Sequence, residues 1–397
     1  MNQAIVGTNM QSLTNILRQI SICLLFLGLG GCSDLTDWVA ETFILPTEDV
    51  RAPSFSVWTE RRVGFVTADG VQLLADVHHP LGPDKTPTIL VRIPFTNTFG
   101  NRLRSDAIAR YWARRGYTVV IQGTRGRYES GGRFYPMVHE YADGKETLNW
   151  LARQEWYDGR LAMWGGSAFG QTQWAVSESS ANAPQAYFIH IASSNFREMF
   201  YPGGAFSLET ALFWAMRSRG QEDHEVDIDQ MLHALETLPN ITADDRATGN
   251  TQFYDDWLLN QHNDAYWFPI DGKNRVNKLS GPVFLLAGWF DPFLPTQPND
   301  FVKVQKSEND RIASESQLII GPWGHALEIE LPGFGDSPNY RAASFAPSIA
   351  WFDAQLDVSP VTGETSAVKL YVLGANQWRD ESEWPLKRTQ FTQVLSA

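Results

Sequence analysis

Cysteine is almost missing from this chain, which has only Cys23 and Cys32 among its 397 residues. Cys23 lies in an N-terminal apolar run of the kind that is removed as a signal peptide, so the mature chain would keep one cysteine and no disulfide. Packing alone therefore has to stabilise the fold.

Basic clusters and low-complexity tracts are missing too. The formal net charge is −13 and no basic patch interrupts it, which argues against a nucleic acid as a partner. Hydrophobic residues make up 43% of the chain and charged residues 19%, without a low-complexity stretch. This composition predicts one large packed domain with additions rather than disorder.

The hydrophobic run near the N-terminus is shorter than a typical membrane-spanning helix. Ile20 to Leu29 follows Arg18 and is short, as in a signal peptide. The run ends in Leu29-Gly30-Gly31-Cys32, which resembles a bacterial lipobox. We therefore expect residues 1–31 to be removed and Cys32 to carry a lipid that attaches the chain to a membrane. Ser33 favours the outer membrane or its periplasmic face in a Gram-negative host; an ordinary secretory signal is the alternative.

Strand-like and helix-like segments alternate along most of the chain. The first pair flanks Ala68-Asp69-Gly70, a hairpin signal. Later strand-like runs are Thr88–Ile93, Tyr117–Gln122, Leu161–Trp164, Tyr187–Ala192, Pro282–Gly288 and Gln317–Ile320, with helical patterns such as Arg104–Arg115 and Ala142–Gln154 between them. Alternation of this kind predicts an α/β fold with a mostly parallel central sheet.

The character of the chain changes in its middle. Residues 195–279 show helical patterns only, so we expect a helical cap between two parts of the core, 61–194 and 280–360, after a tether and lead-in at 32–60. An acidic run in the cap, from Glu222 to Asp229, is more typical of a solvated face than of a cation site.

One glycine-rich turn organises the core. Gly165-Gly166-Ser167-Ala168 follows an apolar strand and opens a helical pattern. Such a sharp strand-to-helix turn lifts the serine hydroxyl clear of the backbone and points amides at its target. Gly170 stands one position later than the usual second glycine, so a purely structural turn is the alternative for this motif taken alone.

An acid and a histidine follow in the order that this nucleophile requires. Asp291 ends the strand Val283–Phe290, and His325 follows the strand Gln317–Ile320 through Gly321-Pro322-Trp323-Gly324. Chemistry in open α/β sheets collects at the carboxyl ends of strands. Ser167, Asp291 and His325 therefore form a candidate catalytic triad in the chain order of α/β-hydrolases, with the Ala168 backbone amide as an oxyanion donor.

These motifs resemble those of the cocaine-esterase and X-prolyl dipeptidyl-peptidase-like hydrolases, relatives of α-amino-acid ester hydrolases and glutaryl-cephalosporin acylases. The matching stretches are Gly123-Thr124-Arg125-Gly126, Trp156-Tyr157-Asp158-Gly159, Gly165–Trp174, Gly288-Trp289-Phe290-Asp291 and Gly321–His325. The resemblance implies an α/β-hydrolase core with a helical cap and serine hydrolysis of esters or amides. It also implies that residues 361–397 hold only the start of the family's C-terminal jelly-roll β-sandwich, as a truncated gene product would.

The chain departs from this family at positions that bear on activity. Phe95 stands where the family has a tyrosine whose hydroxyl helps to hold the oxyanion, so that donor is absent, and Thr96 or Asn97 is a candidate substitute. Ala168 replaces a residue that is commonly tyrosine, which makes the pocket wall smaller. Phe293 and Leu294 stand where amino-ester hydrolases carry acidic residues that bind a substrate ammonium group, so neutral or apolar acyl groups are favoured.

The leading hypothesis is a serine hydrolase that cleaves a small-molecule ester or amide, or a short peptide, without a metal or organic cofactor. An X-Pro dipeptidyl-peptidase is the first alternative. A degenerate hydrolase that acts as a binding lipoprotein is the second, motivated by Phe95 and the short C-terminal segment. Association between copies of the chain is left open.

Overall fold

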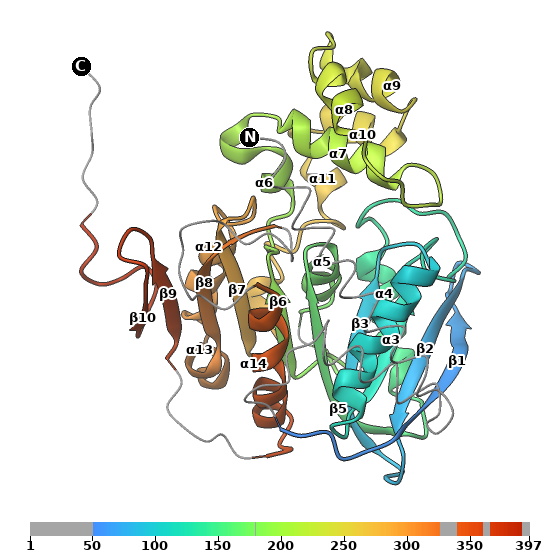
Figure 1. The fold of residues 1–397 in the computed structure, drawn as a ribbon, viewed down its shortest axis with the longest axis vertical. Helices are drawn as coiled ribbons and strands as arrows, with labels where there is room; N and C mark the ends of the chain where they lie inside the picture. The colour runs from blue at the N-terminus through green and yellow to red at the C-terminus, as the bar shows by residue number, and fades with distance from the viewer. Residues whose placement is uncertain (1–50, 179, 326–339, 360–365, 391–397) are drawn as a thin grey trace, which may run out of the picture.

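The computed structural model describes residues 51–178, 180–325, 340–359 and 366–390. Cys32 and the expected signal peptide lie outside these residues. The described strands form one ten-stranded sheet in the order β1-β2-β4-β3-β5-β6-β7-β8-β9-β10 (Figure 1). They are β1 Val57–Val66, β2 Gln72–Pro80, β3 Thr86–Ile93, β4 Thr118–Gly123, β5 Tyr157–Gly166, β6 Ala186–His190, β7 Val283–Phe290, β8 Gln317–Gly324, β9 Val368–Val372 and β10 Gln377–Glu381.

Strands β3 to β9 run parallel, and the outer strands β1, β2 and β10 pair antiparallel with their neighbours. The central strands are buried along their length, which explains why their sequences are apolar without alternation. The α/β fold class with a mostly parallel sheet is thereby confirmed. β1 begins at Val57, inside the segment expected to be a lead-in.

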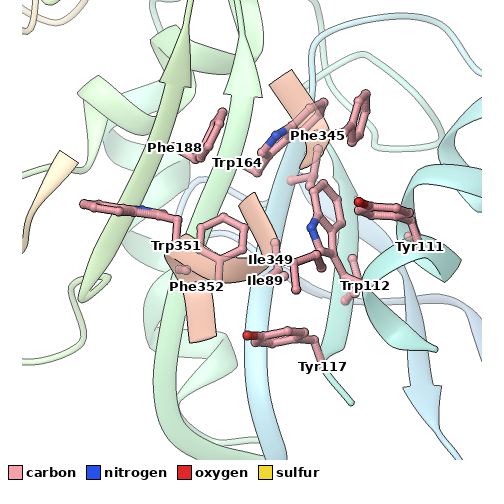
Figure 2. Close-up of a cluster of buried hydrophobic side chains, with 14 of the residues drawn as sticks. Ile89, Tyr111, Trp112, Tyr117, Trp164, Phe188, Phe345, Ile349, Trp351 and Phe352 are labelled. Carbon is pink, nitrogen blue, oxygen red and sulfur yellow. The ribbon is translucent and has the colours of Figure 1, made fainter. Parts of the chain in front are cut away.

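Helices cover both faces of the sheet. One face packs against α3 (Phe99–Ala113) and α14 (Tyr340–Gln355) through a cluster of buried rings that includes Trp112, Trp164 and Phe345 (Figure 2). The other face packs against α4 (Glu140–Leu151), α5 (Ala168–Ala175), α12 (Gln297–Val304) and α13 (Asp310–Glu315). Much of the high aromatic content therefore serves the core.

The segment between β6 and β7 is helical and lies beyond the carboxyl ends of the strands (Figure 1). Its helices are α6 Arg197–Phe200, α7 Leu208–Ser218, α8 Ile228–Leu235, α9 Ala243–Ala247, α10 Gln252–Leu259 and α11 Asp264–Trp267, with short 3₁₀ turns at Pro202–Gly204, Asn240–Thr242 and Val276–Lys278. These helices form a hydrophobic cluster of their own, which also includes Ala168 and Phe293 from the core. The helical segment therefore packs directly over the end of the sheet where Ser167 lies.

The C-terminal strands extend the central sheet. β9 pairs in parallel with β8, and β10 pairs with β9. The described part of this segment therefore joins the core sheet. That residues 361–397 begin a further β-sandwich stays a prediction. Within the described ranges, no helix is long and apolar enough to cross a bilayer.

Candidate active site

Ser167 occupies a strained turn between β5 and α5. Its backbone has φ 52° and ψ −125°, a conformation that residues other than glycine rarely adopt. The Ser167 amide donates a hydrogen bond of 3.0 Å to the His190 carbonyl at the end of β6. The turn therefore presents the hydroxyl at the carboxyl edge of the sheet, as in a nucleophile elbow.

The glycines around Ser167 are required by close packing. A Cβ atom on Gly166 would lie 2.2 Å from Nδ1 of His190, and one on Gly165 would lie 2.4 Å from Cβ of Phe169. At Gly170 the added Cβ would lie 2.5 Å from Cβ of Ala192. The position of Gly170 thus follows from the packing of α5 against the residues after β6.

The structure brings Ser167, His325 and Asp291 together. Nε2 of His325 lies 2.8 Å from the Ser167 hydroxyl, and Nδ1 lies 2.6 Å from Oδ2 of Asp291. Asp291 is buried, and its other carboxylate oxygen accepts a hydrogen bond of 2.8 Å from the Phe293 amide. The imidazole is 40% exposed, so it is held by the carboxylate on one side and is open to a substrate on the other.

Two buried polar residues, His190 and Asp300, support the turns around the triad. No sequence motif indicated this role for either of them. His190 lies beneath Ser167, and its Nδ1 pairs with the hydroxyl of Tyr340. Burial, and then the nearby His325, lower the pKa of His190 to about 3, so this ring is neutral at ordinary pH.

Asp300 is the second of these residues. Its carboxylate accepts hydrogen bonds from the Ser193 hydroxyl at 2.8 Å, from the Ser194 amide at 2.7 Å and from the Ser194 hydroxyl at 2.5 Å. Burial raises the pKa of Asp300 to about 6. These bonds tie the turn after β6 to α12, the helix that follows the Asp291 loop.

The turn after β3 is organised differently. Phe95 has no side-chain donor, and its ring packs against Phe169 at 5.4 Å between centroids. The Thr96 hydroxyl and amide both donate to Oδ2 of Asp223, at 2.9 and 2.7 Å, and the Asn97 side chain donates to Glu129 at 3.0 Å. Both Thr96 donors are therefore engaged, and the Asn97 amide group uses one of its two N–H donors on Glu129.

The acidic run in the cap is a solvated face at Glu222, Glu225, Asp227 and Asp229, as expected, and these contacts correct the interpretation for Asp223 alone. Asp223 is not on a solvated face: its side chain is only 9% exposed, and its carboxylate lies 4.0 Å from Arg127. It connects the cap to the turn after β3 through Thr96. A sequence pattern cannot reveal this contact, because the two residues are 127 positions apart.

Two backbone amides near Ser167 stay unengaged. Among the described residues, the N–H groups of Phe95 and Ala168 donate to no protein acceptor. They follow the neighbouring strands β3 and β5, which pair in parallel, so both amides lie at the same edge of the sheet.

The described part of the chain holds no group of three or more His, Cys, Asp or Glu side chains suited to a metal ion.

Comparison with known proteins agrees with this architecture. The family model of the X-Pro dipeptidyl-peptidases (S15 family) matches residues 69–327. Cocaine esterase from Rhodococcus sp. (strain MB1 Bresler) is 31% identical over 360 residues, which cover 82% of this chain and 60% of that protein. The chain therefore spans about 60% of the length of this curated relative.

Solved structures with low sequence identity share the fold. An α-amino acid ester hydrolase superposes with a TM-score of 0.64 at 19% identity, covering 87% of this chain and 61% of that one. An aminopeptidase from the marine sediment archaeon Thaumarchaeota archaeon gives 0.63 at 19% identity, covering 86% and 62%. The family model spans more than half of the chain, and we conclude that the chain belongs to the X-Pro dipeptidyl-peptidase (S15) family.

Proposed function

We propose that this chain is a serine hydrolase that cleaves ester or amide bonds through an acyl-Ser167 intermediate. The observation that carries the proposal is the continuous hydrogen-bonded relay from the Ser167 hydroxyl through His325 to Asp291, at 2.8 and 2.6 Å. Nucleophile and base within hydrogen-bond reach, with the base oriented by a third group, are the signature of nucleophilic catalysis.

In this mechanism His325 takes the proton of Ser167 as the hydroxyl attacks the substrate carbonyl, and gives it to the leaving group. Asp291 holds the imidazole in the tautomer that has its proton on Nδ1 and stabilises the imidazolium that forms. Water then attacks the acyl-Ser167 ester with His325 again as the base. The acid is released and Ser167 is regenerated.

The developing oxyanion would be held by backbone amides. Ala168 supplies one amide at the start of α5, and the unengaged amide of Phe95 supplies the second. A hydrogen-bond donor from the residue after the nucleophile and another from the loop after β3 form the usual oxyanion hole of α/β-hydrolases. Without the tyrosine hydroxyl the oxyanion hole has one donor fewer, but these two backbone amides remain.

The surroundings of the triad favour substrates whose acyl group carries no ammonium. Phe293, which replaces an acidic residue, packs its ring 5.9 Å from His325. Phe95 and Phe169 add apolar surface beside Ala168. Burying a cationic group against these rings without a carboxylate would be costly, so neutral or apolar acyl groups fit better.

A fluorophosphonate probe tests the proposal directly. We expect the probe to label the wild type on Ser167 and to leave Ser167→Ala unlabelled. Gly100→Ala serves as a folded control, since a Cβ there meets nothing within 4 Å and the triad side chains are unchanged. Equal labelling of wild type and Ser167→Ala would show that the nucleophile is another residue.

The family match supports X-Pro dipeptidyl-peptidase activity as a second candidate. A panel of X-Pro anilides against aryl and alkyl esters separates the two functions. We expect faster turnover of the esters; selective cleavage of the anilides would reverse the order. Absence of any turnover that depends on Ser167 would leave the binding protein as the remaining function.

We further propose that Cys32 anchors the chain to a membrane. The support is the Leu29-Gly30-Gly31-Cys32 motif after an apolar run. Metabolic labelling with an alkynyl fatty acid should mark the wild type and not Cys32→Ser. Equal labelling of both would exclude this anchor.

A further inference from the structure

The C-terminal hairpin, which we define as residues 368–381 (β9, β10 and their turn), lies beside β8, and β8 separates it from β7. β7 ends at Phe290, directly before the acid Asp291, and β8 leads to the base His325; β9 is the next strand along the sheet. We propose that this hairpin is a positioning element of the active site, which holds His325 and Asp291 in register through Trp378 and Tyr371. The inference rests on the proposed function.

Trp323 connects the hairpin to His325. It stands two residues before the histidine, is 4% exposed, and packs its ring 5.8 Å from that of Trp378 on β10. Gly321 is required beneath this ring, because a Cβ there would lie 2.1 Å from a Trp323 ring atom. The Trp323 ring is therefore confined between the strand below it and the hairpin beside it.

Trp378 is itself fixed on the hairpin. Tyr371 on β9 packs edge-on against it at 5.3 Å, and the ammonium group of Lys369 lies 5.5 Å from its ring centroid. Aromatic pairs in this geometry add to the stabilisation that burial alone provides. Trp378 is only partly buried, so removing its ring would open this side of Trp323 to solvent and allow the Trp323 ring to shift.

The acid is held from the opposite face of the sheet. The indole N–H of Trp289, two residues before Asp291, donates a hydrogen bond of 2.7 Å to the Tyr371 carbonyl. Because β8 lies between β7 and β9, this side chain spans β8 at its carboxyl end. Trp289 packs with the cluster on the α4 and α5 face, while Trp323 belongs to the cluster on the α3 and α14 face.

The Trp323 side chain also contacts the residue that supports the nucleophile. Its ring lies 5.9 Å from that of Tyr340, whose hydroxyl pairs with His190 beneath Ser167. The hairpin thus contacts the residues that precede His325 and Asp291, and it is connected to the Ser167 turn through Trp323, Tyr340 and His190 in succession. A displacement of about 1 Å at a catalytic group lowers turnover by about 100-fold in well-oriented active sites.

The test compares Trp378→Ala with Trp58→Ala in the full chain. Trp58 lies on β1, at the opposite edge of the sheet, where it stacks on His79 at 4.4 Å. We expect Trp378→Ala to lower kcat by about 10- to 100-fold with KM within about threefold, and Trp58→Ala to leave both within about threefold. Trp378→Phe, which keeps a ring against Trp323, should recover most of kcat.

A second variant keeps the inference testable if Trp378→Ala does not fold. Trp289→Phe keeps a ring and removes only the N–H that reaches Tyr371, and should lower kcat by about 3- to 10-fold with KM unchanged. Wild-type kcat in both Trp378→Ala and Trp289→Phe would overturn the inference, as would an equal loss in Trp58→Ala. Loss of the dependence on Ser167 in the same assay would instead overturn the proposed function.

Discussion

The turn after β5 and the turn after β3 follow neighbouring strands of one sheet. They contribute to the active site in different ways. Around Ser167 each glycine is required because a Cβ atom would collide with a neighbour, and the backbone itself is strained. Around Phe95 the Thr96 and Asn97 side chains donate to carboxylates, and the Phe95 backbone amide donates to no acceptor among the described residues. The first turn supplies chemistry through a side chain and the second through its backbone.

The largest expected effect is the difference in kcat between removing the Ser167 hydroxyl and removing the Thr96 hydroxyl. Ser167→Ala should lower kcat for p-nitrophenyl butyrate by about 10⁴-fold or more, as loss of a nucleophile does in other serine hydrolases. Thr96→Ala should stay within about threefold of wild type, because the Thr96 hydroxyl is committed to Asp223. A comparable loss in Thr96→Ala would show that its hydroxyl takes part in catalysis.

A pair of glycine substitutions compares the packing of the two turns. Gly166→Ala should reduce the free energy of unfolding by about 3 kcal/mol and lower kcat, since its Cβ would meet the His190 ring. Gly100→Ala, at the start of α3, meets nothing within 4 Å and should be neutral or slightly stabilising. Chemical denaturation of both variants measures the difference; equal stabilities would contradict the steric account.

The pH dependence of stability tests the residue beneath Ser167. Unfolded His190 takes up a proton near pH 6.5, whereas the folded residue does so only near pH 3, so the free energy of unfolding falls as the pH falls through this window. Between pH 7.5 and 5.0 this residue should account for about 2 kcal/mol of the loss. Denaturation of wild type and His190→Gln at both pH values isolates its share; an identical loss in the two proteins would refute it.

The smallest expected effect concerns the missing tyrosine. If the Phe95 amide already serves as a donor, Phe95→Tyr should change kcat by less than about threefold. If the second donor were missing, restoring the hydroxyl would raise kcat by about 10²-fold, the size of effect seen when an oxyanion donor is removed. Steady-state kinetics with an aryl ester, with Phe95→Leu as the control for ring loss, distinguish the two results.

Local patterns and chain order were sufficient to predict the fold class and the three residues that the structure brings together. Ser167 stands in a glycine-rich turn, and Asp291 and His325 each follow an apolar strand, so their chain order and strand-end positions could be recognised. These features depend on a few neighbouring residues, which is why the sequence alone reveals them.

Contacts between distant segments could not be predicted in this way. The bond from Thr96 to Asp223 joins the core to the cap, and the strand pattern at 368–372 does not say which strand it will pair with. The hydrogen-bond partners of His190 and Asp300 lie more than 100 positions away in the chain, so they depend on the tertiary structure. Their roles in supporting the active site follow from the arrangement of the strand ends in the sheet.

The most direct test of the central claim is the mass of the enzyme during turnover. After rapid acid quenching of a reaction with a slowly deacylated aryl ester, we expect the mass of one acyl group on the peptide that contains Ser167. The same peptide from Ser167→Ala should be unmodified. An acyl group on a different residue, or continued turnover by Ser167→Ala, would contradict the account.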